Sequence, residues 1–298
     1  VAKAGFEEWM KALTERERTA ALLSGFSGNP GDIAILPGDK PGEWSAAVGI
    51  DEKRSVWDLA PAAQKLPAAT YRLAGGAAGP AGLGWLLAQY KFDRFLSKAD
   101  TAGDRILLVS EPGIIVDQVR QAEATAMVRD LVNTPAADLG PAGLQAAAEA
   151  LGTEFEATVH VTKGHELEVG YPMIHAVGQA AEKHRAPRLI ELVRGNPKHP
   201  RVAVIGKGVA FDTGGLNIKT GPYMRLMKKD MGGAAHALAL ARLVMEARLP
   251  VHLHLLIPAV ENAVAGNAML PGDVLKSRKG LTVEIDNTDA EGRLILGD

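Results

Sequence analysis

The sequence predicts an α/β protein with a small N-terminal α/β domain and a larger domain whose mostly parallel central sheet is flanked by helices. A length of 298 residues, of which 47% are hydrophobic and 23% charged, is typical of about two globular domains with ample core. In the C-terminal part, short apolar segments alternate with segments of helical periodicity, as in a parallel sheet covered on both faces. We place the smaller domain at residues 1–110, a linking helix at 111–135 and the larger domain at 136–298.

The smaller domain contains two apolar strand candidates, residues 32–36 and 105–109, and a helix candidate at residues 83–96. The glycine-rich segment 75–82 predicts a turn from a strand to a helix. It does not match a dinucleotide-binding loop, because the spacing is not G-x-G-x-x-G and Pro80 lacks a donor amide. The Ser-Glu-Pro-Gly sequence at residues 110–113 predicts the end of this domain.

The linking helix is predicted from apolar residues that recur at helical spacing between residues 115 and 132, ahead of Pro135. Within the larger domain, the strand candidates are residues 158–161, 188–193, 202–205, 251–257 and 282–285, and the helix candidates are residues 141–151 and 231–247. In such folds, ligands collect at the carboxyl ends of the strands.

Charged residues follow two of these strands. Lys207 and Asp212 come after the strand at 202–205, and Asp289 and Glu291 come after the strand at 282–285. We therefore expect both pairs to lie at the same edge of the sheet.

The composition excludes several classes of function and of metal site. A net charge of −2 gives no support for binding to nucleic acid or to an anionic membrane, and no apolar run is long enough for a membrane span. The first residues lack the basic and apolar regions of a signal peptide, so we expect a cytoplasmic protein. Without cysteine, a metal ion would be held by carboxylates, histidine, carbonyl groups or an unusual lysine.

Two charged clusters predict a hydrolase site with two metal ions. In the first, Asp289 and Glu291 are two residues apart, so on an extended segment both carboxylates would point the same way, with Arg293 beside them to hold an anion. The second cluster comprises Lys207, Asp212, Lys219 and Asp230, within a glycine-rich stretch that we read as a loop between a buried strand and a helix.

The carboxylates and lysines of these clusters have other possible roles. For Asp230 alone, the plainer interpretation is a cap on the helix that follows it. Four carboxylates together would repel one another, and two divalent cations remove that penalty. Lysine is a rare ligand because its amine must first lose a proton, which burial beside a dication would favour.

Three ordered motifs, at residues 204–215, 228–235 and 287–294, closely resemble those of the leucyl aminopeptidase (cytosol aminopeptidase) family. The last, Asn-Thr-Asp-Ala-Glu-Gly-Arg-Leu, is the signature of that family, and the resemblance runs from about residue 128 to 298. The resemblance implies one tightly held metal on Lys207, Asp212, Asp230 and Glu291, and one more exchangeable metal on Asp212, Asp289 and Glu291. It also implies that Lys219 polarises the scissile carbonyl and that Arg293 holds a bicarbonate ion that shuttles a proton.

The resemblance further implies an aminopeptidase that cleaves the N-terminal peptide bond of peptides with a free N-terminus, with a metal-bridging hydroxide as the nucleophile. Zinc and manganese are the expected metals, because both suit mixed oxygen and nitrogen ligation. The complete enzyme would be a cytoplasmic homohexamer. Relatives continue beyond the Arg293 motif, so the larger domain is expected to be incomplete at its C-terminus, without part of the substrate pocket.

Three alternatives stay open at this point. The chain could be a non-catalytic oligomeric scaffold or regulatory protein of the same fold, an inactive fragment, or a metal-dependent hydrolase of another amide or dipeptide substrate. An intact set of ligands argues against the scaffold, and the expected loss of the C-terminal part argues for it.

The remaining histidines are weaker candidates. His252 and His254 alternate as a same-face metal pair would on a strand, but neither matches a family ligand, so ordinary sheet histidines are the favoured interpretation. His165 and His175 lack an H-E-x-x-H partner, and His236 is expected to be an ordinary helix residue.

Overall fold

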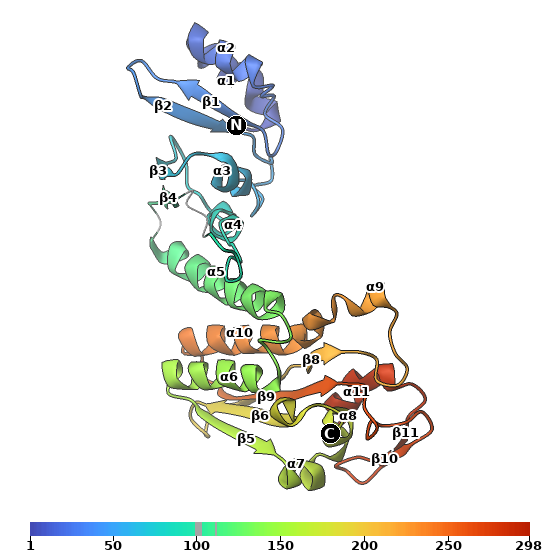
Figure 1. Ribbon diagram of the computed structural model, residues 1–298. Helices are drawn as coiled ribbons and strands as arrows, with labels where there is room; N and C mark the ends of the chain where they lie inside the picture. The colour runs from blue at the N-terminus through green and yellow to red at the C-terminus, as the bar shows by residue number, and fades with distance from the viewer. Residues whose placement is uncertain (99–102, 111) are drawn as a thin grey trace. The chain divides into compact units, whose positions relative to one another are not determined.

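A computed structural model describes residues 1–98, 103–110 and 112–298, which divide into two compact units, Val1–Ala126 and Met127–Asp298 (Figure 1). The α/β class is confirmed in both units. The division between the units falls inside a helix, whereas the predicted division into residues 1–110, 111–135 and 136–298 stays a prediction. Glu111, within the predicted boundary, lies outside the described residues.

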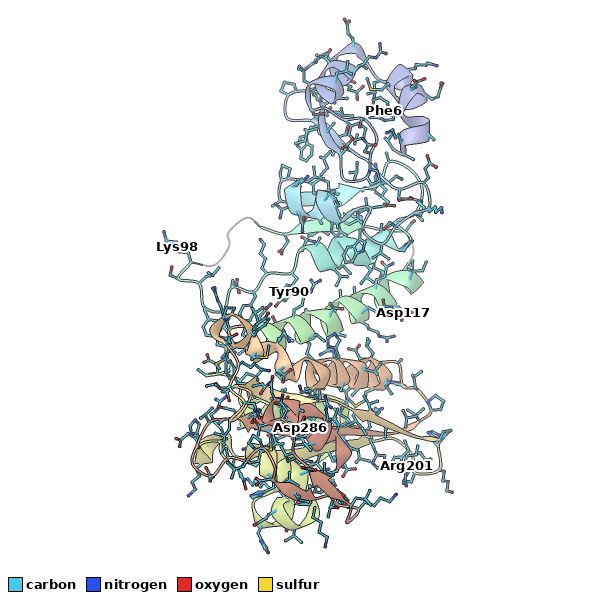
Figure 2. The ribbon with its side chains drawn as sticks, turned by 90° about the vertical axis from the view of Figure 1, so that its right-hand side faces the viewer. Phe6, Tyr90, Lys98, Asp117, Arg201 and Asp286 are labelled. Carbon is cyan, nitrogen blue, oxygen red and sulfur yellow. The ribbon has the colours of Figure 1, made fainter. Side chains whose placement is uncertain are left out.

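The N-terminal unit contains short helices and two strand pairs. Its elements are η1 (Lys3–Gly5), α1 (Phe6–Ala12), α2 (Glu15–Leu23), β1 (Ile33–Pro37), β2 (Trp44–Val48), α3 (Ala60–Lys65), β3 (Ala69–Arg72), α4 (Ala81–Ala88) and β4 (Arg105–Leu108); Phe6 is labelled in Figure 2. β1 pairs antiparallel with β2, and β3 pairs parallel with β4. The predicted strands at 32–36 and 105–109 and the turn at 75–82 are thereby confirmed.

The helix predicted at residues 83–96 is too long, because α4 ends at Ala88. The side chain of Gln89 bonds to the backbone of Arg105 in both directions, each at 3.0 Å: its Nε2 donates to the carbonyl and its Oε1 accepts from the amide. These two bonds hold Gln89 at the start of β4. A further turn of α4 would move Gln89 away from Arg105, so the helix ends here.

The second unit contains most of the regular structure. Its elements are α6 (Pro141–Phe155), β5 (Thr158–Lys163), α7 (His165–Gly170), α8 (Pro172–Gly178), η2 (Lys183–Arg185), β6 (Arg188–Arg194), β7 (Arg201–Ile205), β8 (Gly208–Asp212), α9 (Gly221–Met224), η3 (Met227–Met231), α10 (Gly232–Glu246), β9 (His252–Asn262), β10 (Val274–Lys276), β11 (Thr282–Glu284), η4 (Thr288–Ala290) and α11 (Glu291–Gly297). Helix α5 (Pro112–Asn133) contains the division between the units and confirms that the segment with helical spacing between residues 115 and 132 is a helix.

The central sheet is mixed, so the prediction of a mostly parallel sheet is wrong. The described strands form a five-stranded sheet in the order β5-β6-β9-β7, with β8 paired to the second half of β9. β7 and β8 run parallel to β9, whereas β5–β6 and β6–β9 are antiparallel. Only residues 195–200 join β6 to β7, which is too short for the crossover that a parallel connection requires.

Helices cover both faces of this sheet, as the sequence predicts (Figure 1). On one face, α6 and α10 pack Leu144 and Leu238 against Leu192 and Leu255 of the strands, all fully buried. On the other face, α8 and α11 contribute a second cluster with strand residues such as Val260. Each fully buried leucine stabilises the fold by about 1.5–3 kcal/mol, so both cores hold the central strand β9 firmly.

The segment 282–285 does not join the central sheet as predicted. β11 pairs antiparallel with β10 in a separate hairpin. The chain then enters η4 and α11 in place of the extended segment that the sequence suggested, so Asp289 and Glu291 do not share one side of a strand.

Within the described ranges, we find no helix that combines the length and the apolar character that crossing a membrane requires.

Candidate metal centre

Asp212 is the last residue of β8, at the carboxyl end of a strand that pairs with β9. The sequence had placed residues 208–212 in a loop; they form a strand because Val209 and Ala210 are buried against the core. The Asp212 side chain is buried, and its Oδ1 accepts hydrogen bonds from the amide of Gly214 and from Nδ2 of Asn262, each at 2.8 Å. These donors fix the direction of its carboxylate.

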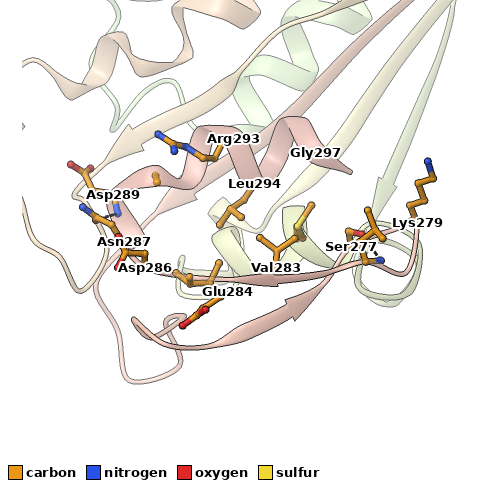
Figure 3. A pocket seen from close by; sticks show the side chains of 14 residues that line it. Ser277, Lys279, Val283, Glu284, Asp286, Asn287, Asp289, Arg293, Leu294 and Gly297 are labelled. Carbon is orange, nitrogen blue, oxygen red and sulfur yellow. Dashed lines mark hydrogen bonds between the residues drawn. The ribbon is translucent and has the colours of Figure 1, made fainter.

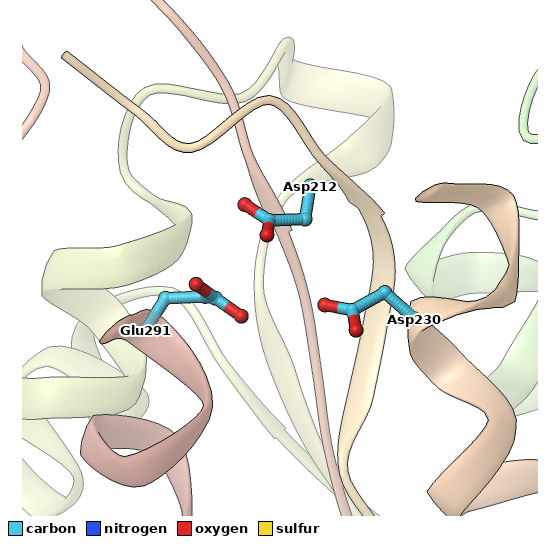
Figure 4. A group of neighbouring side chains, drawn as sticks. All are labelled: Asp212, Asp230 and Glu291. Carbon is cyan, nitrogen blue, oxygen red and sulfur yellow. The ribbon is translucent and has the colours of Figure 1, made fainter. Parts of the chain in front are cut away.

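The carboxylates of Asp212, Asp230 and Glu291 point toward one another (Figure 4). One oxygen from each lies within 4.8 Å of the other two. Glu291 begins α11 and is 2% exposed, and Asp230 belongs to η3. The interpretation of Asp230 as a helix cap is wrong, because Met231 is the N-cap of α10 and the Asp230 carboxylate is directed into this cluster.

Lys207 reaches the same point from the connection between β7 and β8. Its Nζ lies 2.8 Å from Oδ2 of Asp230 and 2.9 Å from Oε1 of Glu291. A Cβ atom at position 292 would lie 2.7 Å from Cε and 2.9 Å from Nζ of this lysine, so any larger residue there would force the end of the lysine side chain to move. Gly292 of α11 thus leaves room for the side chain in its observed position.

The ion pairs with Asp230 and Glu291 raise the pKa of Lys207. Burial by itself lowers the pKa of the amine, but the hydrogen bonds and charges of Asp230 and Glu291 outweigh burial and raise it. Lys207 is thus an ammonium group here, and its ligation to a metal would release a proton.

Lys219 and Asp289 form the second half of the cluster. Nζ of Lys219 lies 2.9 Å from Oδ2 of Asp212 and also contacts Oδ1 of Asp289. Burial lowers the pKa of Lys219, and the two carboxylates more than reverse that effect, so its pKa is raised. Because Asp212 contacts Lys219 and also belongs to the first carboxylate group, the two halves are continuous.

Arg293 lies apart from this network. It is two residues beyond Glu291 on α11, and residues at that spacing do not share a helix face. Glu291 is buried, whereas Arg293 is exposed and lines a cavity of about 700 Å³ together with Asp289 and Asn287 (Figure 3). The structure thus brings the predicted site residues together, with Arg293 beside them on the cavity side.

The donor set fits divalent cations. Four carboxylates face two ammonium groups, which leaves negative charge uncompensated when all are ionised. Burial and the neighbouring Asp212 raise the pKa of Glu291, despite the opposing effect of Lys207. Its Oε2 is buried and accepts no hydrogen bond from the residues that the structure describes. A divalent ion satisfies both the unpaired oxygen and the excess charge.

A neutral hydrogen-bond network, which sequence reasoning missed, holds the two charged segments together. Thr288 is fully buried; its hydroxyl donates to the carbonyl of Gly214 at 2.6 Å and accepts from the amide of Asn217 at 2.9 Å. Its amide donates to Oδ1 of Asn217 at 2.8 Å, and Asn262 Nδ2 donates to its carbonyl at 3.1 Å. We call Asn217, Asn262 and Thr288 the polar latch. The only signal in the sequence was the place of Thr288 inside the 287–294 motif.

The other histidines lie outside the cluster. His236 is on α10, where its Nδ1 lies 2.7 Å from the carbonyl of Gly232, which confirms an ordinary helix residue. His165 begins α7 and pairs with Glu168 at 3.5 Å, and His175 is on α8.

Comparison with known proteins identifies the two parts of the chain. A family profile described as the cytosol aminopeptidase family, catalytic domain, matches residues 126–298, and one described as the M17 aminopeptidase, N-terminal domain, matches residues 1–108. A probable cytosol aminopeptidase from Rhodococcus jostii (strain RHA1) is 40% identical over 236 residues, covering 74% of this chain and 46% of that protein. One from Leifsonia xyli subsp. xyli (strain CTCB07) is 36% identical over 309 residues, covering 95% of this chain and 61% of that protein.

Solved structures agree with these matches. The crystal structure of a cytosol aminopeptidase from Coxiella burnetii has a TM-score of 0.92 at 38% identity and covers 100% of this chain and 65% of that one. The bottromycin maturation enzyme BotP in complex with Mn has a TM-score of 0.84 at 31% identity, covering 93% and 64%. The chain spans about half the length of the curated relatives it matches. Because the catalytic-domain profile covers the whole charged cluster and more than half of the sequence, this chain belongs to the cytosol aminopeptidase family.

Proposed function

We propose that the charged cluster is the metal centre of an aminopeptidase that hydrolyses the N-terminal peptide bond of peptides. The observation that carries this proposal is the convergence of Asp212, Asp230 and Glu291 on one point, where an oxygen of Glu291 is buried without a donor among the described residues. A site that served only packing would not assemble so many charges at the end of a buried strand.

The residues divide between two ions. Lys207, Asp212, Asp230 and Glu291 would hold one, and Asp212, Asp289 and Glu291 the other. Zinc and manganese both suit these ligands, and the likeness to BotP in complex with Mn supports manganese. When bound, the two ions would supply Lewis-acid activation of the peptide carbonyl and hydroxide at neutral pH as the nucleophile.

Lys219 supplies a fixed positive charge. Its raised pKa keeps it an ammonium at neutral pH, and its two carboxylate partners, Asp212 and Asp289, are both proposed metal ligands. When those carboxylates turn to cations, the Lys219 ammonium is free to donate to the carbonyl oxygen of the substrate. A donor aimed at the oxygen on which negative charge develops stabilises the transition state.

Arg293 would assist proton transfer, and Asp230 would lie where the free amine of the peptide binds. Arg293, exposed on the cavity side, would hold a bicarbonate ion as proton acceptor. The free α-amine of the peptide would bind close to Asp230, which would restrict cleavage to the N-terminal residue. For the complete protein we propose a homohexamer, and a location in the cytosol in keeping with the name of the family.

The decisive experiment is hydrolysis of leucine p-nitroanilide by the 298-residue chain, with and without added Mn²⁺ or Zn²⁺, together with metal analysis of the same sample. Metal-dependent release of p-nitroaniline is the expected result. Asp289→Asn should abolish it, whereas Asp138→Asn, which removes an exposed carboxylate outside the cluster, should not.

Other outcomes separate the alternatives. Bound metal without turnover on any aminoacyl anilide would favour the scaffold or an incomplete substrate pocket. Turnover only on dipeptides or other amides would shift the substrate class. Absence of metal binding would overturn the ligand assignment.

A further inference from the structure

A second group of metal-ligand side chains lies at the opposite end of β9. His252 and His254 alternate with Leu253 and Leu255, whose side chains pack in the core under α6 and α10. The two histidines therefore emerge on the other face of the sheet, together with Glu191 of β6. The proposed aminopeptidase centre uses none of these three residues.

The two imidazole rings face each other edge to face. Their centroids are 4.5 Å apart with an interplanar angle of 79°, and Nε2 of His254 lies 3.4 Å from Nδ1 of His252. Two nitrogens on one tetrahedral ion, each about 2.05 Å from the metal, are separated by about 3.3 Å. The pair thus already has the spacing of two imidazole ligands on a single ion.

Glu191 sets the tautomer of His254. Its Oε1 lies 3.0 Å from Nδ1 of that ring, and a carboxylate can only accept, so Nδ1 carries the proton. Nε2 of a neutral His254 therefore presents a lone pair toward His252. Metal-binding histidines commonly have such a carboxylate on the nitrogen that faces away from the metal.

The neighbouring strand β7 sets how strong such a site can be. Ala203 is the partner of His254 in the register and is small and exposed, which leaves room for water. Arg201, labelled in Figure 2, is the partner of His252, and its positive charge opposes a cation. We expect a site of moderate affinity.

We propose that Nδ1 of His252 and Nε2 of His254 bind one divalent transition-metal ion of the zinc class, with Glu191 orienting His254 and water completing the coordination. The ion takes the place of the single proton that the two facing nitrogens share. The site is separate from the carboxylate cluster, because His254 and Asn262 lie eight residue steps apart on β9, a span of about 26 Å of extended strand.

The test uses the full chain labelled with ¹⁵N in histidine, stripped of metal and titrated with ZnCl₂. The carboxylate cluster contains no histidine, so its filling leaves imidazole nitrogens in place. The expected result is that the ring nitrogens of His252 and His254 shift together as zinc binds. Ring resonances that stay unchanged while metal analysis shows zinc on the chain would overturn the proposal.

Variants make the test quantitative. His252→Gln and His254→Gln should each abolish this binding, and Glu191→Gln should weaken it about 10–100-fold, as loss of an orienting carboxylate does. Arg201→Gln should tighten it. His199→Gln, in the exposed turn between β6 and β7, is the matched control and should bind zinc as the parent does.

Circular dichroism of each variant checks the fold. Equal zinc affinity in the parent and in a folded His254→Gln variant would overturn the proposal. The contact between the two histidines would then be an ordinary hydrogen bond. This outcome leaves the aminopeptidase proposal untouched, because that proposal rests on other residues.

Discussion

The charged cluster has two halves that hold a lysine in different ways. In the first half, Lys207 is gripped by Asp230 and Glu291, which belong to helical elements, and it passes the backbone of Gly292. In the second half, Lys219 comes from a loop, and the polar latch joins that loop to η4. The first half is thus shaped by backbone packing, and the second by hydrogen bonds between neutral side chains. We therefore expect substitutions in the two halves to have different effects on metal binding, turnover and stability.

The largest loss of activity is expected at Glu291, which is assigned as a ligand of both metal ions. Glu291→Gln removes a charge assigned to both ions, so leucine p-nitroanilide hydrolysis should fall by about three orders of magnitude, equivalent to several kcal/mol. Metal analysis should show fewer bound ions at the same total metal. Glu166→Gln, which alters an exposed residue of α7, serves as the control. A Glu291→Gln variant with normal turnover would remove the basis of the metal assignment.

The two lysines should separate metal binding from transition-state stabilisation. Lys219→Met should lower kcat about 10²–10³-fold with its metal content kept, because only a donor to the developing oxyanion is lost. Lys207→Met should instead weaken binding of the tightly held ion. Steady-state kinetics with parallel metal titrations distinguish the two. If both variants lose metal equally, the division of roles between the lysines is wrong.

Backbone packing of the first half can be tested at a pair of glycines. Gly292→Ala places a methyl group 2.7 Å from Cε of Lys207, so the end of that side chain must move away from its two carboxylate partners; we expect a cost of about 1 kcal/mol, at the low end for overpacking. A methyl group on Gly232, the first residue of α10, meets no described atom within 4 Å, so Gly232→Ala should be neutral or slightly stabilising. Chemical denaturation of both variants measures the difference. Equal stability would contradict the close approach of Lys207.

The second half should be sensitive to the latch. Thr288→Val keeps the shape of the side chain but strands the Gly214 carbonyl and the Asn217 amide, at an expected cost of about 1–3 kcal/mol. Thr288→Ser should restore most of that stability, since the hydroxyl returns. If turnover falls in the valine variant and recovers in the serine variant, the latch positions the Lys219 loop. A serine variant as weak as valine would indicate that packing of the methyl group matters more.

The smallest effect is a pH dependence of the metal-stripped chain. The folded-state pKa values of Lys207 and Lys219 are raised, so their contribution to stability is complete below the ordinary lysine pKa of 10.5 and is lost as the pH rises through the folded values. The pKa of Glu291 is also raised, so its contribution is present below 4.5 and declines as the pH rises through its folded value. Thermal melts should therefore show stability falling above about pH 10.5 in the parent, and less so in Lys219→Met.

The sequence predicted the site better than the path of the chain that builds it. Short apolar segments marked β7 and β4 correctly, because a short run of aliphatic residues favours a strand, even though many of these side chains stay exposed. The place of β11 was wrong, since a three-residue strand carries too little pattern to choose between the central sheet and its neighbour β10. The charged residues still converge, because η4 and α11 bring Asp289 and Glu291 back to the end of β8.

What the sequence could not show were interactions set by tertiary contacts alone. Gln89 ends α4 by bonding to a strand residue 16 positions away, and Thr288 acquires its partners 71 and 74 positions away. No local pattern reports such pairings. The same holds for Arg293, whose separation from the lysine network follows from α11 being helical where an extended segment was expected.

The ammonium groups of Lys207 and Lys219 also bear on whether folding or metal binding comes first. In zinc-finger domains the ligands have no substitute for the ion, so the polypeptide folds only when metal arrives. Here two built-in cations already offset part of the charge of the four carboxylates, so folding can precede metal loading. This charge balance therefore favours folding before metal binding, with the proton of Lys207 exchanged for an ion when metal becomes available.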